Sequence, residues 1–168
     1  MSKRDYIVSS AHLADPGVEE LSEFEYGLTL AHNAFERWVV RCMTAAGYPD
    51  LSKVDIQVLH SVHHRGRPKR LADLCFVLNI EDSHVVNYAL RKLTQLDLVV
   101  RARPGKEVFY ATTTKGDEAC RRYREVRQAC LLAVPTPPTD HGGLGETAGL
   151  LRALSGLYEQ AARAAASL

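Results

Sequence analysis

The sequence predicts a mainly α-helical fold with one small β-hairpin (α+β). Two observations lead to this prediction. Apolar residues recur at steps of three and four through most of the 168 residues, which is the period of an α-helix. The pattern changes at residues 98–112, where two short segments rich in β-branched and aromatic residues flank an Arg-Pro-Gly-Lys turn. The length suits one domain with helical extensions.

Composition excludes several classes of protein. Hydrophobic residues make up 46% of the chain and charged residues 24%, which is typical of a folded protein rather than a disordered one. The longest apolar runs span only a few residues, so we expect no transmembrane helix and no membrane partner. The N-terminus lacks the apolar stretch of a secretory signal. The four cysteines form no CxxC pair, which indicates reduced thiols and a cytoplasmic location.

The N-terminal part predicts an arm and a long helix. Residues 1–19 are polar and contain an Asp-Pro-Gly turn, so we expect a flexible arm, followed by a dimerisation helix within residues 20–50. A helix over 21–46 is about 39 Å long, more than one small domain needs to cover. Its apolar stripe therefore favours a partner helix, from the same subunit or a second one. The stripe consists of Phe24, Leu28, Ala31, Phe35, Trp38, Cys42 and Ala45.

Residues 51–113 are expected to hold three short helices and the hairpin. The first helix follows Ser52, whose spacing to Asp55 is that of a capping box. The second is expected to open at Pro68, because a first-turn residue needs no backbone donor. Asn79 can end that helix in the left-handed conformation.

The third helix of this region is expected to start at a cap, Asp82 or Ser83, and to run to about residue 96. One face is apolar and is expected to pack into the core, and it comprises Val85, Val86, Ala89, Leu90, Leu93 and Leu96. The opposite face is polar and comprises Ser83, His84, Asn87, Tyr88 and Arg91. The hairpin follows directly and carries the basic residues Arg101, Arg103 and Lys106.

Residues 114–168 return to helical periodicity and are expected to form C-terminal dimerisation helices. Thr114 and Asp117 have capping-box spacing, which predicts a helix from about residue 115 to 132. A Pro/Gly linker is expected at 134–143. The last helix, from about residue 144, has stripes that repeat every seven residues and need a partner to cover them. They comprise Leu144, Leu151, Leu154, Tyr158, Ala161, Ala165 and Leu168.

The net charge of +1 conceals a basic region. Residues 60–106 hold 9 Lys and Arg against 4 Asp and Glu, whereas residues 1–50 hold 4 against 8. The basic excess coincides with the three short helices and the hairpin. A cluster of positive charge on one module is typical of a surface that faces phosphates.

Three helices followed by a hairpin is the element order of a winged helix-turn-helix. The major groove of B-DNA is about 12 Å wide and admits one α-helix, which needs an apolar face for the core and a polar face for the bases. Asn87 can read adenine and Arg91 guanine, while Ser83 and first-turn amides can hold a phosphate. The residues predicted to contact double-stranded DNA are Lys69, Arg70, Ser83, His84, Asn87, Tyr88, Arg91, Arg101, Arg103 and Lys106.

Residues 28–132 resemble the MarR family of bacterial transcription regulators. The motifs that carry the resemblance are Leu71-Ala72-Asp73-Leu74, the recognition-helix segment 83–93, Leu98-Val99, and Thr113-Thr114-Lys115-Gly116. The sequence departs from the family at Asp97, where a glycine is usual, and in a short wing without the Asp-x-Arg element.

The resemblance implies a homodimer that binds a pseudo-palindromic operator and responds to a small-molecule effector. Its N- and C-terminal helices would interlock. The residues expected at the dimer contact are Phe24, Leu28, Phe35, Leu151, Leu154 and Tyr158. The effector would bind where the long helices meet the DNA-binding lobe, with His32, Phe35, Trp38, Cys42 and His60 as candidates.

Two alternatives stay open at this point. The winged helix can serve as a protein-interaction module without DNA, or a thiol such as Cys42 or Cys120, each next to arginine, can sense oxidation. His60, His63 and His64 have loose metal spacing without a local Cys or carboxylate, so we expect no metal and no cofactor. The sequence has no Gly-rich phosphate loop, nucleophile elbow or paired-carboxylate motif, so we do not expect an enzyme.

Overall fold

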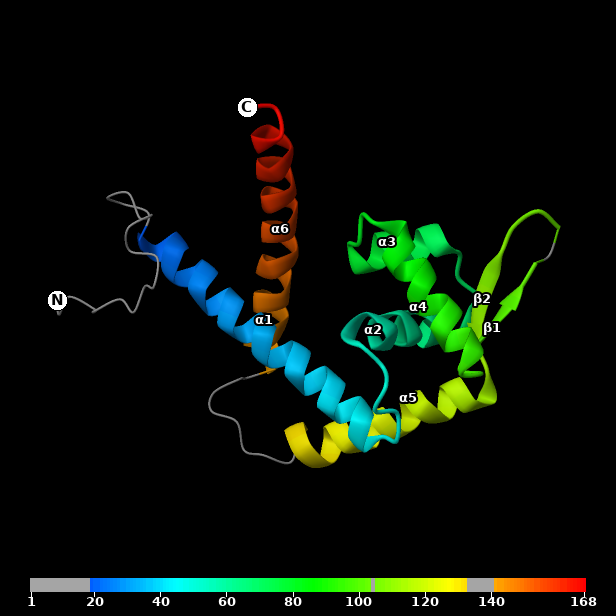
Figure 1. The fold of residues 1–168 in the computed structure, drawn as a ribbon. Helices are drawn as coiled ribbons and strands as arrows, with labels where there is room; N and C mark the ends of the chain where they lie inside the picture. Colours follow the sequence, from blue (N-terminus) through cyan, green and yellow to red (C-terminus); the bar gives the residue numbers. More distant parts are fainter. Residues whose placement is uncertain (1–18, 104, 133–140) are drawn as a thin grey trace. The chain divides into compact units, whose positions relative to one another are not determined.

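The computed structural model describes residues 19–103, 105–132 and 141–168 (Figure 1). The element order is α1 (Glu19–Ala45), α2 (Lys53–His63), η2 (His64–Gly66), α3 (Leu71–Leu78), α4 (Ser83–Gln95), β1 (Val99–Ala102), β2 (Phe109–Thr112), α5 (Thr114–Arg127), η3 (Gln128–Leu132) and α6 (His141–Ala165). The expected mainly helical fold with one hairpin is confirmed. Except for Glu19, which already belongs to α1, the expected arm lies outside the described residues.

The chain divides into two units, one up to Leu131 and one from Leu132 onward. In the second unit, α6 begins at His141, so the last three residues of the expected linker are helical; residues 133–140 lie outside the described part. Glycine weakens a helix but does not forbid it, and a helix of 25 residues can extend through two glycines at its start. Among the described residues, none of the helices combines the length and the apolar character that crossing a membrane requires.

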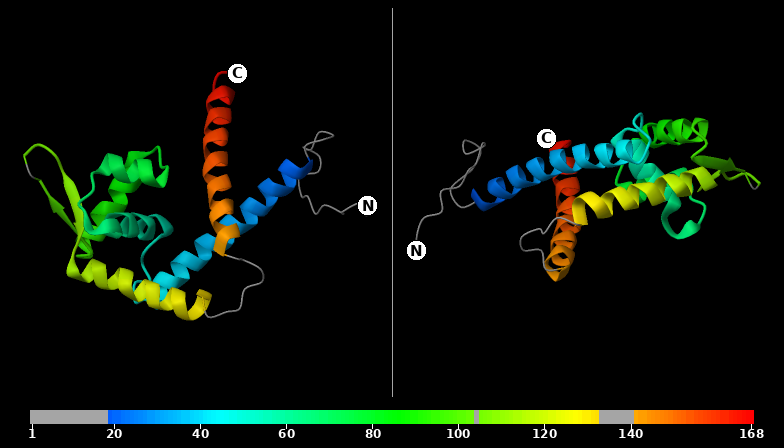
Figure 2. Two further views of the ribbon diagram at one scale, coloured as in Figure 1. Left: turned by 180° about the vertical axis from the view of Figure 1, so that it is seen from behind. Right: turned by 90° about the horizontal axis from the view of Figure 1, so that it is seen from below.

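The first unit has one hydrophobic core, to which α1, α2, α3, α4, β1, β2 and α5 all contribute. Figure 1 shows α2, α3 and α4 grouped beside the hairpin, and Figure 2 shows the C-terminal part of α1 next to α5. The largest fully buried side chains are Met43, Ile56, Leu59, Leu74, Leu90, Leu93 and Leu98. Only the C-terminal part of α1 reaches this core, through Val39 and Met43, and Ala46 follows directly after the helix. The rest of the helix leaves apolar side chains such as Leu30 and Phe35 more than half exposed.

Several local predictions are confirmed. Ser52 and Asp55 form a reciprocal capping box at the start of α2. Asn79 ends α3 with φ 54° and ψ 45°, in the left-handed region. Asp97 has φ 58°, so it adopts the conformation for which glycine is usual in related sequences. The amide of Leu98 then donates to the carbonyl of Leu93 at 2.9 Å and closes α4.

Two predicted helix starts are wrong. Pro68 does not open α3, which begins at Leu71, because Lys69 is held extended against Tyr110 by two backbone hydrogen bonds of 2.8 and 2.9 Å. The cap of α5 is Thr113 rather than Thr114, and its hydroxyl accepts from the amide of Gly116 at 3.0 Å. Pairing with β2 therefore sets the start of α3. At the start of α5, the amide of Thr113 donates to the carbonyl of Leu98, just before β1, at 3.1 Å.

Candidate nucleic-acid interface

Helix α4 has a buried face and an exposed polar face. Val86, Ala89, Leu90 and Leu93 are at most 1% exposed. The polar residues of α4 that are predicted to contact DNA lie on the remaining circumference. Four of them are exposed and Asn87 is half-buried, and the set comprises Ser83, His84, Asn87, Tyr88 and Arg91. The structure thus places this part of the predicted site on the outward face of one helix.

The predicted apolar face of α4 is too wide by two residues. Val85 is 40% exposed and Leu96 is 37% exposed, although both were expected in the core. The buried arc contains positions separated by three, four and seven residues, and Val85 lies about 100° around the helix from Val86. The neighbouring elements cover only this narrower arc.

Lys92 holds α4 on the body of the domain. Its Nζ donates to the carboxylate Oδ2 of Asp55 at 2.8 Å and to the backbone carbonyl of Asp50 at 2.5 Å. Asp55 is 2% exposed, so the ion pair lies at the edge of the core. This cation points inward and is not part of the outward face.

The start of α4 is acidic. Asp82 is the N-cap, and its Oδ1 accepts from the amide of His84 at 2.8 Å. Glu81 and Asp82 are both exposed at this end. Negative side chains at this end interact favourably with the positive end of the helix dipole and repel a phosphate. Their carboxylates can still accept hydrogen bonds from the amino groups of bases.

The hairpin carries its basic residues at the distal end. Val99 pairs with Thr112 and Ala102 with Phe109, in antiparallel register. Val99 and Tyr110 are buried, which anchors the base of the hairpin in the core. Arg101, Arg103 and Lys106 are exposed.

Lys69 and Arg70 are both held by contacts within the protein. The ammonium of Lys69 donates to the carbonyl oxygens of His64 and Arg67, at 2.9 and 2.6 Å. Arg70 donates to Asp73 at 3.1 and 3.2 Å and to Glu107 at 3.3 Å, so the pKa of Asp73 lies below its usual value. A lysine ammonium group has three N–H donors and an arginine guanidinium group has five, so each side chain can still donate to a further acceptor.

Two exposed arginines close to Lys69 and Arg70 were not among the predicted DNA contacts. Arg65 and Arg67 lie between α2 and α3, and Arg65 has a positive φ of 62°. They line a pocket of about 390 Å³ with His63, Thr112 and Asp117. The basic run at 63–67 is visible in the sequence, but only the folded chain shows that it lies beside β2.

The candidate effector residues do not share one environment. Cys42 and His60 both lie against Tyr123 of α5: the Cys42 thiol donates to its carbonyl at 3.5 Å, and the His60 ring meets its ring at 4.5 Å between centroids. His32 is exposed and pairs with Glu36 at 2.7 Å, and Phe35 is 55% exposed. His60 also borders a cavity of about 330 Å³ lined by Ser61, His64, Lys69, Asp73, Leu74 and Val77.

Burial keeps His60 neutral. Desolvation, with smaller contributions from the charges of His63 and Arg124, lowers its pKa to about 4. The unfolded imidazole takes up a proton below pH 6.5 and the folded one does not until about pH 4, so stability falls as pH drops through this window. We expect the free energy of unfolding to fall by about 2 kcal/mol between pH 7 and pH 5. Urea unfolding of the wild type and of His60→Phe, which keeps the ring contact, measures this; equal pH dependence in both would contradict it.

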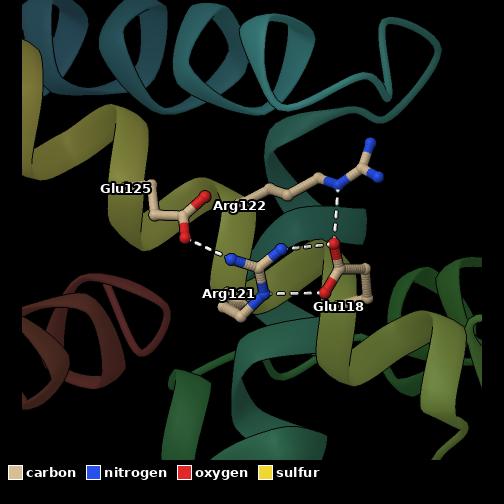
Figure 3. Close-up of polar contacts among 4 residues, drawn as sticks. All are labelled: Glu118, Arg121, Arg122 and Glu125. Atoms are coloured by element: carbon tan, nitrogen blue, oxygen red, sulfur yellow. Dashed lines mark hydrogen bonds and ion pairs between the residues drawn. The ribbon is translucent and has the colours of Figure 1, made fainter.

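Three of the four cysteines have the environment of structural thiols, and Cys130 is exposed. Burial raises the pKa of Cys42 and Cys75, and that of Cys120 to about 12, so their thiolates are disfavoured. The arginines that follow Cys120 face carboxylates instead: Arg121 contacts Glu118 at 2.6 Å and also pairs with Glu125, and Arg122 contacts Glu118 at 2.9 Å (Figure 3). These hydrogen bonds lower the pKa of Glu118 to about 2. The structural basis for a redox switch is therefore weak at these three thiols.

The described part of the chain contains no group of three or more His, Cys, Asp or Glu side chains arranged to hold a metal ion. His63, one of three histidines considered for such a site, contacts Asp117 through Nδ1 at 3.0 Å. The same carboxylate oxygen accepts from the hydroxyl of Thr112 at 2.5 Å. This cluster connects α2, β2 and α5 within the protein.

Comparison with known proteins agrees with this arrangement. Residues 51–116 match the family described as winged helix DNA-binding domain. The solved Staphylococcus aureus MepR–DNA complex is similar over 80% of this chain and 97% of its own, at 15% identity and a TM-score of 0.64. The Listeria monocytogenes multiple antibiotic-resistance repressor (MarR) is similar over 86% and 98%, at 15% identity and a TM-score of 0.51.

A third similar structure contains a small molecule. CouR from Rhodococcus jostii RHA1, bound to p-coumaroyl-CoA, covers 78% of this chain and 90% of its own, with 14% identity and a TM-score of 0.61. Identities this low establish the fold, and the MarR-type fold expected from the sequence is confirmed. A comparison with curated proteins gives no match.

Proposed function

Because residues 51–116 belong to the winged helix DNA-binding domain family and the chain has the MarR-type fold, we propose that it is a sequence-specific transcription regulator that binds double-stranded DNA as a homodimer. The observation that carries the proposal is the division of α4 into a fully buried face and an exposed polar face, next to a basic hairpin. A polar helix face by itself is usual at a solvated surface, and it is the basic hairpin directly beside it that favours DNA. The MepR–DNA complex supports the proposal by fold.

In this proposal Asn87 and Arg91 read base edges in the major groove, Ser83, His84 and Tyr88 lie beside them, and the hairpin contacts the backbone. Arg101, Arg103 and Lys106 are free to move onto phosphates. Lys69 and Arg70, already oriented by their internal hydrogen bonds, each supply a further donor. Asp82 occupies one first-turn amide, so Ser83 contacts a base or sugar more favourably than a phosphate.

Long helices are proposed to join two copies. Residues 20–50 and 114–168 would supply the interface, through Phe24, Leu28, Phe35, Leu151, Leu154 and Tyr158. The exposure of Phe35, at 55%, and of Leu151, at 40%, supports this, because large apolar side chains in a stripe need a cover. Two recognition helices would then enter successive major grooves, about 34 Å apart, on a pseudo-palindromic operator. Light scattering of the purified chain measures the dimer directly.

Replacing Arg91 with alanine tests the base-reading role. After selection of binding sites from a random DNA pool, Arg91→Ala is expected to cost about 1–3 kcal/mol on the selected site and to relax one base position. Arg103→Ala should weaken selected and random duplexes alike and lower the salt slope by about one. Arg121→Ala, on α5, is the matched control and should leave affinity unchanged. Equal weakening of both duplexes by Arg91→Ala would remove Arg91 from the base-reading set.

A small-molecule effector is the second part of the proposal. The CouR complex with p-coumaroyl-CoA shows a ligand on a related fold, and the cavity beside His60 offers a place for a small molecule here. His32, Phe35, Trp38 and Cys42 are candidates for a pocket completed by the partner subunit. Such a ligand acts by favouring one spacing of the two recognition helices. A thermal-shift screen, followed by DNA release with each hit, tests this; hits that never change DNA affinity would oppose it.

A further inference from the structure

Helix α4 exposes apolar surface on two side chains, the branched chain of Val85 and the aromatic ring of Tyr88. Val85 is 40% exposed and Tyr88 is 72% exposed. They are three residues apart on α4, so they are neighbours on the same side of the helix. Since Val86, Ala89, Leu90 and Leu93 already attach α4 to the core, these two side chains are not needed for packing.

The position of the pair favours contact with bases over contact with phosphates. Val85 lies in the first turn of α4, next to the exposed carboxylates of Glu81 and Asp82. These charges repel the phosphate backbone. On the floor of the major groove, the apolar group that distinguishes one base from the others is the 5-methyl group of thymine.

We propose that Val85 and Tyr88 pack against thymine 5-methyl groups and thereby select A·T pairs under the first turn of α4. The proposal rests on the proposed DNA-binding function and adds two specificity-determining residues to it. Helical periodicity alone places one of them, Val85, in the core. Contact with the methyl group removes apolar surface of both partners from water. Hydrogen bonds from Asn87 and Arg91 would read the neighbouring base pairs.

Single replacement of thymine by deoxyuridine tests the contact, because it removes the methyl group and keeps the Watson–Crick pair. On the selected operator, each thymine of a half-site is replaced in turn. The wild-type protein is expected to lose about fourfold in affinity at one or two positions, which corresponds to the burial of one methyl-sized group. Val85→Ala should bind the thymine and uracil versions of that position equally.

The control is Val100→Ala, which truncates another exposed valine, 49% exposed, on β1. It should keep the full sensitivity to deoxyuridine. Val85→Ser, which removes both methyl groups of the valine, serves as a second variant if Val85→Ala unfolds, and it should reduce the sensitivity as well. Circular dichroism confirms folding in each case.

The outcomes separate this proposal from the function on which it rests. Sequence-specific binding without sensitivity at any thymine would overturn the methyl contact and leave the regulator function intact. The same holds for a selected half-site without thymine under α4, or for sensitivity that persists in both Val85 variants. Absence of specific DNA binding at low salt would overturn the function itself.

Discussion

Replacing Gly116 with alanine is expected to lower the free energy of unfolding by about 3 kcal/mol or more. Gly116 is buried in the first turn of α5, directly against the backbone that leads into β1. A Cβ at this position would lie 2.0 Å from the carbonyl oxygen of Leu98 and 3.0 Å from its carbonyl carbon. The same oxygen accepts from the amide of Thr113 at 3.1 Å, so neither backbone segment can move without breaking the start of α5.

The glycine is needed for space rather than for its conformational freedom, since Gly116 is not among the described residues with positive φ. Gly27→Ala provides the matched control, because Gly27 is in α1 with no atom within 4 Å of an added Cβ. That substitution should stabilise the helix by about 0.5–1 kcal/mol. Urea unfolding of the three proteins measures both changes. Equal stability of Gly116→Ala and wild type would show that the approach to Leu98 is not tight.

Replacing Asp55 with alanine is expected to cost about 3 kcal/mol, the second large effect. The carboxylate Oδ2 of Asp55 accepts from the amide and the hydroxyl of Ser52, both at 2.8 Å, and from Lys92 at 2.8 Å. Alanine removes the capping box of α2 and leaves the Lys92 ammonium with the carbonyl of Asp50 alone. Since Lys92 belongs to α4, the loss also weakens the attachment of α4 to α2.

A double-mutant cycle separates the cap from the ion pair. Ser52→Ala should cost about 1 kcal/mol, the usual value of a lost N-cap. Lys92→Met keeps the apolar stem and removes the charge. The double variant Asp55→Ala/Lys92→Met should lose less free energy of unfolding than the sum of the losses in the two single variants. Additive effects, measured by urea unfolding, would mean that the ion pair contributes nothing and that the cap accounts for Asp55.

Part of the recognition helix could be predicted from the sequence, and part could not. Helical periodicity separates Asn87 and Arg91 from Leu90 and Leu93, whose burial the structure confirms. The apolar pattern also predicts Val85 in the core, where it does not lie, because a hydrophobic pattern is the same for a buried and for an exposed valine. The difference depends on how much of α4 its neighbours cover.

The same contrast applies to the turns and to the charges. Asn79 has the left-handed conformation predicted from its side chain and position, and Asp97 takes the place of a glycine with the same φ sign. The basic excess of residues 60–106 was countable in the sequence. Sequence did not reveal that Lys92 points inward to Asp55, 37 residues away, or that Arg70 reaches Glu107 across the same separation.

By itself, the sequence determined the helices, the hairpin, their order and most of their ends. The helices depend on residues three or four apart, and the hairpin on two β-rich segments joined by a short turn. Only the tertiary structure decided where α3 and α5 begin, which face of α4 stays exposed and why position 116 must be glycine. Those features arise where Tyr110 meets Lys69 and where Leu98 meets α5. They depend on contacts between segments distant in the chain, and a local pattern of residue types contains no information about such distances.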